Sequence, residues 1–205
     1  MSGEQKPTKP KESGSTSSSP SPPTLPAKTK TSAMAAVAAP QTGIAKEPAP
    51  PKFEKGLADQ LTAEFGDLVK VLFVRPLRLK ILVEPTNVVS VATYLRDTMG
   101  FDHAECAGGT DYPKDNQMEM VYQLGSYTNE DLGPQILMLA VRTNRDDPHL
   151  PTLLNVYKSV EYHERETFEM LGIYFDGHPR NDRFLLPEDW ADLPPLRKDF
   201  RIKGR

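Results

Sequence analysis

The chain has 205 residues, a formal net charge of −3 at pH 7, 20 prolines and one cysteine. A net negative charge argues against a nucleic-acid binder driven by phosphate contacts. Cys106 alone excludes an intrachain disulfide and cannot by itself hold an iron–sulfur cluster or structural zinc, so we interpret it as a small apolar residue. No segment approaches the ~20 apolar residues of a membrane span, so we expect a soluble chain that meets a membrane only through partners.

Residues 1–52 differ in composition from the rest of the chain. They carry half of the prolines, with 7 Lys or Arg and 3 Asp or Glu, a net +4. The remaining residues carry 18 and 25, a net −7. A stretch rich in Pro, Ser, Lys and Ala buries too little apolar surface to offset backbone entropy. We therefore predict a disordered tail, which is either a flexible spacer or a basic docking or membrane-surface arm.

A globular domain is expected over residues 53–175. Apolar residues at intervals of four predict a first helix over 54–66, which ends at Gly66. A continuous apolar run at 69–74 and an alternating run at 77–83 predict two strands that form a hairpin around an Arg-Pro turn.

A second helix is predicted after Thr86 or Asn87, either of which can cap it, and Gly100 closes it. Strand-like runs follow, and the last two are rich in Met, Leu and Val, which indicates antiparallel neighbours. The runs and the turns between them are 101–106, Gly108-Gly109, 117–124, Asn129–Gly133 and 135–141.

The last predicted helix covers 160–171, with Ser159 as its cap and Gly172 at its end. The order of helices and strands predicts an α+β fold, with helices on one face of a mostly antiparallel sheet. Four prolines after Tyr174 preclude regular structure there. We expect residues 176–205 to form an extended arm that wraps over the domain or over a neighbour.

The third helix could carry chemistry only through its charged residues. His163-Glu164 resembles the start of a zinc-protease motif, but the second histidine position is Thr167. Glu164 and Glu166 stand two apart on a helix, about 200° around its axis, and cannot act on one bond. The sequence holds no phosphate-binding loop and no local nucleophile–base signature. It therefore indicates no catalytic site.

The environments of two charged residues on this helix, Arg165 and Glu164, stay open. Arg165 has Glu161 four residues before it and Glu169 four after it, and can pair with either carboxylate on a solvated face. Glu164 falls in the apolar stripe, where it either sits at the stripe's edge or meets a basic group inside an interface.

The final residues offer two more candidates for contacts. Trp190 follows Asp189 in a proline-bounded segment and is expected to anchor against the domain or a partner. Arg197-Lys198-Asp199 is either a solvated end or a donor fork that meets a partner carboxylate or backbone.

Long ordered motifs in this region resemble the thirty-kilodalton-type subunit of respiratory complex I, its C subunit, in a family shared with membrane-bound hydrogenases. The resemblance covers roughly residues 54–200, and its motifs are Gly109–Pro113, Glu164–Pro179, Arg183, Leu185–Pro187, Asp189-Trp190 and Pro195–Phe200. Two departures lie in the arm. Asp182-Arg183 replaces a pair of arginines, and Asp192-Leu193-Pro194 stands where the family often has a glycine.

The resemblance implies a non-catalytic peripheral-arm subunit of a proton-pumping NADH–quinone oxidoreductase, on the cytoplasmic face of the cell membrane. Its partners would be the large quinone-site subunit, of the D type, and the cluster-bearing subunits of the B and I types. FMN, iron–sulfur clusters and quinone would lie in the partner subunits, with no cofactor or metal in this chain. The alternatives are a deazaflavin- or ferredoxin-fed quinone or phenazine reductase, an energy-converting hydrogenase, or a free-standing interaction module.

The subunit interface is expected to use the charged and aromatic residues of these motifs. Glu164→Ala or Arg165→Ala should then weaken assembly without destroying the isolated fold. The expected interface residues are Glu164, Arg165, Glu166, His178, Pro179, Arg183, Trp190, Arg197, Lys198 and Asp199.

Overall fold

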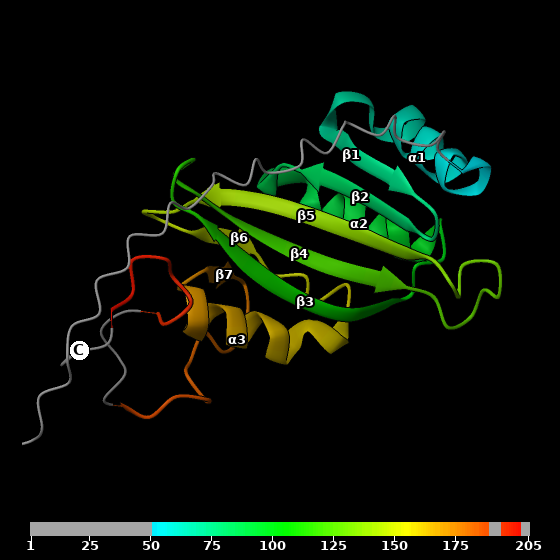
Figure 1. Ribbon diagram of the computed structural model, residues 1–205. Helices are drawn as coiled ribbons and strands as arrows, with labels where there is room; N and C mark the ends of the chain where they lie inside the picture. The colour runs from blue at the N-terminus through cyan, green and yellow to red at the C-terminus, as the bar shows by residue number, and fades with distance from the viewer. Residues whose placement is uncertain (1–50, 189–193, 202–205) are drawn as a thin grey trace, which may run out of the picture. The chain divides into compact units, whose positions relative to one another are not determined.

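The structure is a computed structural model that describes residues 51–188 and 194–201 (Figure 1). The predicted tail, apart from its last two residues, and Trp190 lie outside the described residues.

The first helix and hairpin are confirmed. Helix α1 spans Lys52–Phe65, and strands β1 (Val69–Arg75) and β2 (Arg78–Val83) pair antiparallel. Leu77, which the alternation placed in the second strand, lies in the turn instead, with a φ of 61°. Its backbone N–H donates to the carboxylate of Glu54 at 2.6 Å, which fixes the start of α1 against the turn.

Helix α2 (Val88–Asp97) buries its predicted apolar side, but its start differs from the prediction. Neither Thr86 nor Asn87 caps the helix through its side chain. A 3₁₀ turn, Pro85–Asn87, leads into α2 instead, so this backbone turn, and not a side-chain cap, sets the start of the helix. After α2 the chain reverses at Gly100, which has a φ of 84°.

Five strands form the main sheet in the order β1-β2-β5-β4-β3. The predicted antiparallel pairing of β4 with β5 is confirmed, and β3 also pairs antiparallel with β4. β2 and β5 pair in parallel, which makes the sheet mixed but mostly antiparallel. The last three strands are β3 (His103–Tyr112), β4 (Gln117–Gly125) and β5 (Ile136–Asn144).

The helices pack on one face of this sheet, as predicted (Figure 1). Side chains on that face line up across the strands, as in the row Ile81, Leu139 and Tyr122. Leu61 of α1 and Leu95 of α2 are fully buried in the same apolar cluster. The alternation along each strand thus separates a core face from an outer face.

Strand β3 is longer than predicted, and Gly108-Gly109 lies inside it rather than in a turn. The register pairs Gly109 with Met120, so residue 109 faces the helices. A Cβ at residue 109 would overlap the Cδ1 of Leu171 and lie 3.0 Å from the Cγ2 of Thr167. The glycine is therefore a point of close approach between sheet and helix.

Helix α3 (Glu161–Leu171) ends at Gly172, which has a left-handed φ of 82°, as expected for a C-terminal glycine. Ser159 does not cap the helix, because its hydroxyl donates to the carbonyl of Ala104 at 2.9 Å. The sequence missed a small parallel sheet that flanks α3. It consists of β6 (His149–Pro151) and β7 (Tyr174–Asp176).

The close approach at residue 109 gives a direct test. Gly109→Ala should destabilise the domain by about 1–3 kcal/mol, because the buried side chains of α3 cannot move aside. Gly108→Ala is the matched control, since a Cβ there would meet nothing within 4 Å. Chemical denaturation of both variants measures the difference, and equal stability would contradict this close packing.

Candidate functional site

The carboxylate of Glu164 lies wholly inside the domain, with no exposed surface. It accepts hydrogen bonds from the hydroxyl of Tyr122 at 3.0 Å, from the backbone N–H of Leu153 at 2.9 Å and from the hydroxyl of Thr152. Burial raises the pKa of Glu164, and these donors oppose the rise only in part. Glu164 is therefore neither at the edge of the stripe nor on the surface of the isolated chain.

His178 is the nearest cationic candidate to Glu164. Its Nε2 lies 4.0 Å from the Oε2 of Glu164, and its Nδ1 accepts the backbone N–H of Arg180 at 3.0 Å. The His178 side chain is almost completely buried, so the Gly-His-Pro element is held against α3 from inside the chain.

This position changes what substitutions at Glu164 can reveal. Glu164→Ala would leave three buried donors, including the hydroxyl of Tyr122, without their partner. Each such loss costs roughly 1–3 kcal/mol, so the substitution would act on the fold itself. A loss of assembly in that variant would therefore say little about an interface.

The helical spacing suggested that Arg165 pairs with Glu161 or Glu169. In the structure Arg165 pairs instead with a residue of the C-terminal segment. Its Nη2 lies 2.8 Å from Asp182, and its guanidinium lies over the ring of Phe184, 4.5 Å from the centroid. Asp182 is one of the two departures from the family pattern, and here it supplies the carboxylate that pairs with Arg165.

Glu169 binds the backbone of the same segment. Its carboxylate accepts the N–H groups of Phe184, Leu185 and Leu186 at 3.0, 2.8 and 2.7 Å. Burial favours a higher pKa for Glu169, but these three N–H groups and nearby Arg183 hold it below its usual range. No local sequence pattern links residue 169 to a backbone 15 positions away, so sequence reasoning missed this contact.

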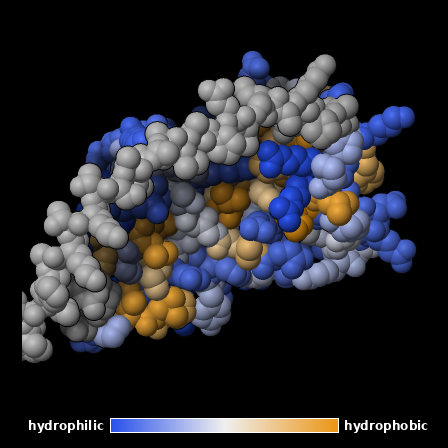
Figure 2. Space-filling model, viewed as in Figure 1, coloured by the Kyte–Doolittle hydropathy of each residue, from blue (hydrophilic) through white to orange (hydrophobic). Residues whose placement is uncertain are grey.

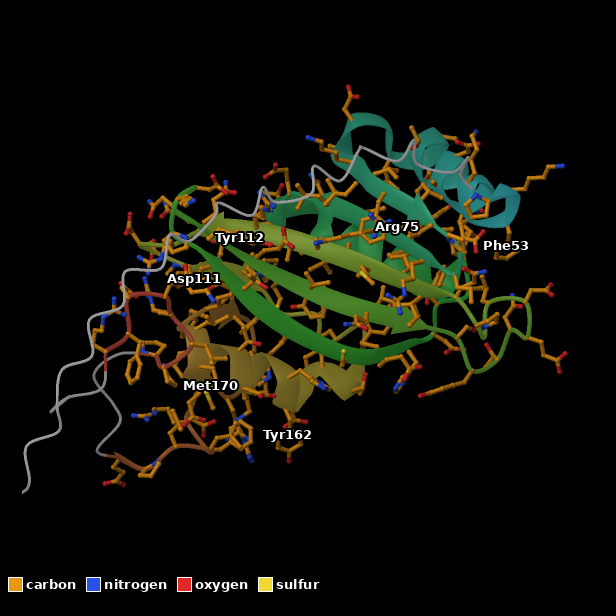
Figure 3. The ribbon with its side chains drawn as sticks, in the orientation of Figure 1. Phe53, Arg75, Asp111, Tyr112, Tyr162 and Met170 are labelled. Atoms are coloured by element: carbon orange, nitrogen blue, oxygen red, sulfur yellow. The ribbon has the colours of Figure 1, made fainter. Side chains whose placement is uncertain are left out.

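The last described residues dock on the far end of β3. The buried Asp111 accepts hydrogen bonds from the Arg145 guanidinium at 2.7 Å and from the backbone N–H of Lys198 at 2.8 Å. Arg145 also contacts Asp199 at 2.8 Å, and Arg197 donates to the backbone carbonyl of Arg145 at 3.0 Å. The expected donor fork thus meets groups of its own chain. Figure 3 shows Asp111 beside residues 194–201, which are drawn in red.

An apolar patch remains on the outside of this arrangement. We call it the α3 patch, and it comprises Tyr162, Phe184 and Leu185, which are 58%, 41% and 48% exposed. Tyr162 points away from the sheet in Figure 3, and Figure 2 shows hydrophobic surface over α3 and the segment after it. The patch is held from beneath by Arg165 and Glu169.

The structure therefore divides the predicted interface residues into three groups. Those that are buried are Glu164, Arg165 and His178. Those that are partly or fully exposed are Glu166, Pro179, Arg183, Arg197, Lys198 and Asp199. Trp190 lies outside the described residues.

Two further features concern metals and membranes. Within residues 51–188 and 194–201, no three or more His, Cys, Asp or Glu side chains are grouped to hold a metal ion. None of the helices in these two ranges is both long and apolar enough to cross a bilayer.

Residues 81–205 match the family model described as respiratory-chain NADH dehydrogenase, 30 Kd subunit, and the chain belongs to this family. The C subunit of F(420)H(2) dehydrogenase from Methanosarcina mazei is 34% identical over 70% of this chain and 89% of that protein. The C subunit of NADH-quinone oxidoreductase from Mycobacteroides abscessus is 37% identical over 75% of this chain and 67% of that protein.

Solved structures share the fold. A chain of an archaeal membrane-bound sulfane sulfur reductase complex is similar with a TM-score of 0.60 and 22% identity, over 73% of this chain and 86% of that chain. A trypsin-resistant fragment of Nqo5 is similar with a TM-score of 0.52 and 23% identity, over 62% of this chain and 97% of that chain.

The contact of Glu169 predicts that trypsin cleaves slowly at the peptide bond between Arg183 and Phe184, because the N–H of that bond donates to Glu169. Glu169→Gln removes the charge and two of the acceptor positions, at a cost of roughly 1.5–3 kcal/mol to the segment. Cleavage after Arg183 should then be at least about tenfold faster. Glu166→Gln, an exposed neighbour on α3, is the control. Equal cleavage rates in both variants would show that Glu169 does not hold the segment.

The docking at Asp111 should depend on pH. Burial favours a higher pKa for Asp111, but Arg145 and the N–H of Lys198 lower it below its ordinary value of 3.8. The contribution of Asp111 is therefore complete above that value and is lost as the pH falls through the lower, folded-state pKa. Hydrogen exchange at the Lys198 amide should show constant protection from about pH 7 to 5 and a decline only below about pH 4.

Asp111→Asn tests the same contact at neutral pH. Loss of the charge should speed exchange at Lys198 roughly tenfold, which corresponds to about 1.4 kcal/mol. Asp115→Asn, in the exposed turn before β4, is the matched control. An unchanged exchange rate in Asp111→Asn would mean that the segment is anchored by other contacts.

Proposed function

We propose that the chain is a non-catalytic peripheral-arm subunit of a proton-pumping NADH–quinone oxidoreductase. It scaffolds the large quinone-site subunit and the cluster-bearing subunits of the B and I types, on the cytoplasmic face of the membrane. FMN, iron–sulfur clusters and quinone are bound by partner subunits. Family membership and the relatives named as the C subunit of NADH-quinone oxidoreductase support this proposal.

The observation that carries the scaffolding role is the α3 patch. Its side chains are large, apolar and exposed, yet the segment that bears Phe184 and Leu185 is fixed by Glu169 and Arg165. A preorganised apolar surface loses little conformational entropy when a partner binds. The buried charges of this region thus position a binding surface, and the exposed side chains contact the partner.

A second candidate is the equivalent subunit of a deazaflavin-fed reductase. Its support is the similarity of this chain to the C subunit of F(420)H(2) dehydrogenase from Methanosarcina mazei, which extends over 89% of that protein. This candidate keeps the same scaffold and changes only the electron donor, which other subunits would bind.

One experiment tests both candidates. A tagged copy of the chain is extracted from membranes in mild detergent, and mass spectrometry identifies the proteins that co-purify. Recovery of cluster-bearing and membrane subunits together with an NADH-binding flavoprotein would support the first candidate. The same set without that flavoprotein would favour the second. Recovery of the chain without redox subunits would overturn both.

The α3 patch gives a prediction for assembly. Phe184→Ala combined with Leu185→Ala should reduce the amount of chain in the complex, because central apolar contacts contribute about 1–3 kcal/mol each. The melting temperature of the isolated chain should change little, since both side chains are exposed. Val89→Ala on α2, where the side chain is 39% exposed, is the control. Full assembly of the double variant would show that the α3 patch is not part of the interface.

A further inference from the structure

The outer face of the main sheet, opposite the helices, is strongly basic over β1, β2 and β5. The strand register places five cations on the outer face of β1, β2 and β5. Two carboxylates of the neighbouring strands lie on the same face, Glu119 of β4 and Glu105 of β3. We call this region the outer basic face. Its cations are Lys70, Arg75, Arg78, Lys80 and Arg142.

Glu119 pairs with two of these cations. Its carboxylate is buried and lies 2.7 Å from the Nζ of Lys80 and 2.7 Å from the Nε of Arg142. This ion triplet has a net charge of +1 and fixes both cations in place. Lys70 and Arg78 are exposed at the β1–β2 side of the face. The guanidinium of Arg75 lies over the ring of Phe73, 4.9 Å from its centroid.

The charge of this face opposes that of the rest of the folded chain. Residues 53–205 have a net charge of −7, whereas Lys70, Arg78, Lys80 and Arg142, taken with the carboxylates of Glu119 and Glu105, give the outer face a net charge of +2. Such segregation creates a local positive potential that attracts an acidic partner. A second copy of the chain would place the same cations against each other.

Apolar groups lie between the cations. Leu82 of β2 is half-buried beside Lys80, and it lines a hollow of about 200 Å³ together with Arg142 and Glu84 at its rim. Figure 2 shows hydrophilic and hydrophobic surface interleaved on this side of the molecule. Along β2 the outward residues are Arg78, Lys80 and Leu82, spaced two apart. Side chains on one face of an extended chain repeat about every 6.6 Å, which matches this spacing.

We infer that the outer basic face binds an extended acidic segment of a partner subunit, whose carboxylates reach Arg78 and Lys70 and whose apolar side chains contact Leu82. This inference rests on the proposed function, because the partner is another protein of the same complex. The outer basic face and the α3 patch lie on different elements, so one chain can bind two partners at once.

Lysine labelling of the intact complex tests the inference. Lys70 should react with an amine-specific reagent in the isolated full-length chain and lose reactivity in the purified complex. A zero-length carboxylate–amine cross-linker should join Lys70 to an Asp or Glu of another subunit. Unchanged reactivity of Lys70, or protection without any cross-link to a protein carboxylate, would overturn the inference and leave the proposed function intact.

A binding measurement decides the question if the chain does not co-purify with a complex. The full-length chain is titrated with a synthetic peptide of alternating Glu and Val. Wild type should bind with strong salt dependence, and Lys70→Glu with Arg78→Glu should bind roughly tenfold more weakly. Lys114→Glu, in the turn before β4, is the control for net charge. Equal binding by both variants, or binding only to vesicles of anionic lipid, would overturn the inference.

Discussion

The buried carboxylate of Glu164 holds together three parts of the molecule, and the other contacts described above depend on their positions. It links α3 to β4 through Tyr122 and to the residues after β6 through Leu153. A carboxylate removed from water is tolerated only where donors surround it, so α3 has one acceptable position on the sheet. The absence of a side chain at Gly109 allows the helix to reach that position.

From this placement the C-terminal residues follow. Once α3 is fixed, Glu169 presents its oxygens to the backbone at 184–186, and Arg165 presents its guanidinium to Asp182. Asp111 fixes the last described residues at the end of β3. Charged residues are therefore used in two ways. Buried ones position the chain's own segments, whereas exposed ones, such as Lys70 on the outer basic face, are in contact with solvent.

The sequence predicted the elements whose signals are local. Alternation and helical spacing located the hairpin β1–β2, helix α2 and the antiparallel pair β4–β5. Gly108-Gly109 was misassigned to a turn because the reason for the glycine is α3, more than 50 residues further along the chain. The small sheet β6–β7 was missed because two three-residue strands carry too little pattern. At the site, the partners of Glu164, Arg165 and Glu169 come from distant segments, and no local pattern in the sequence could predict them.

The parallel pairing of β2 with β5 also sets an order of folding. Arg78 lies beside Ile136 in the register, so the centre of the sheet joins segments that are far apart in the chain. Such contacts form late, because the intervening loop must first be closed. During synthesis the N-terminal half remains an incomplete sheet until β5 has left the ribosome. Since α3 packs on the finished sheet, only a chain that has completed its core presents an ordered α3 patch.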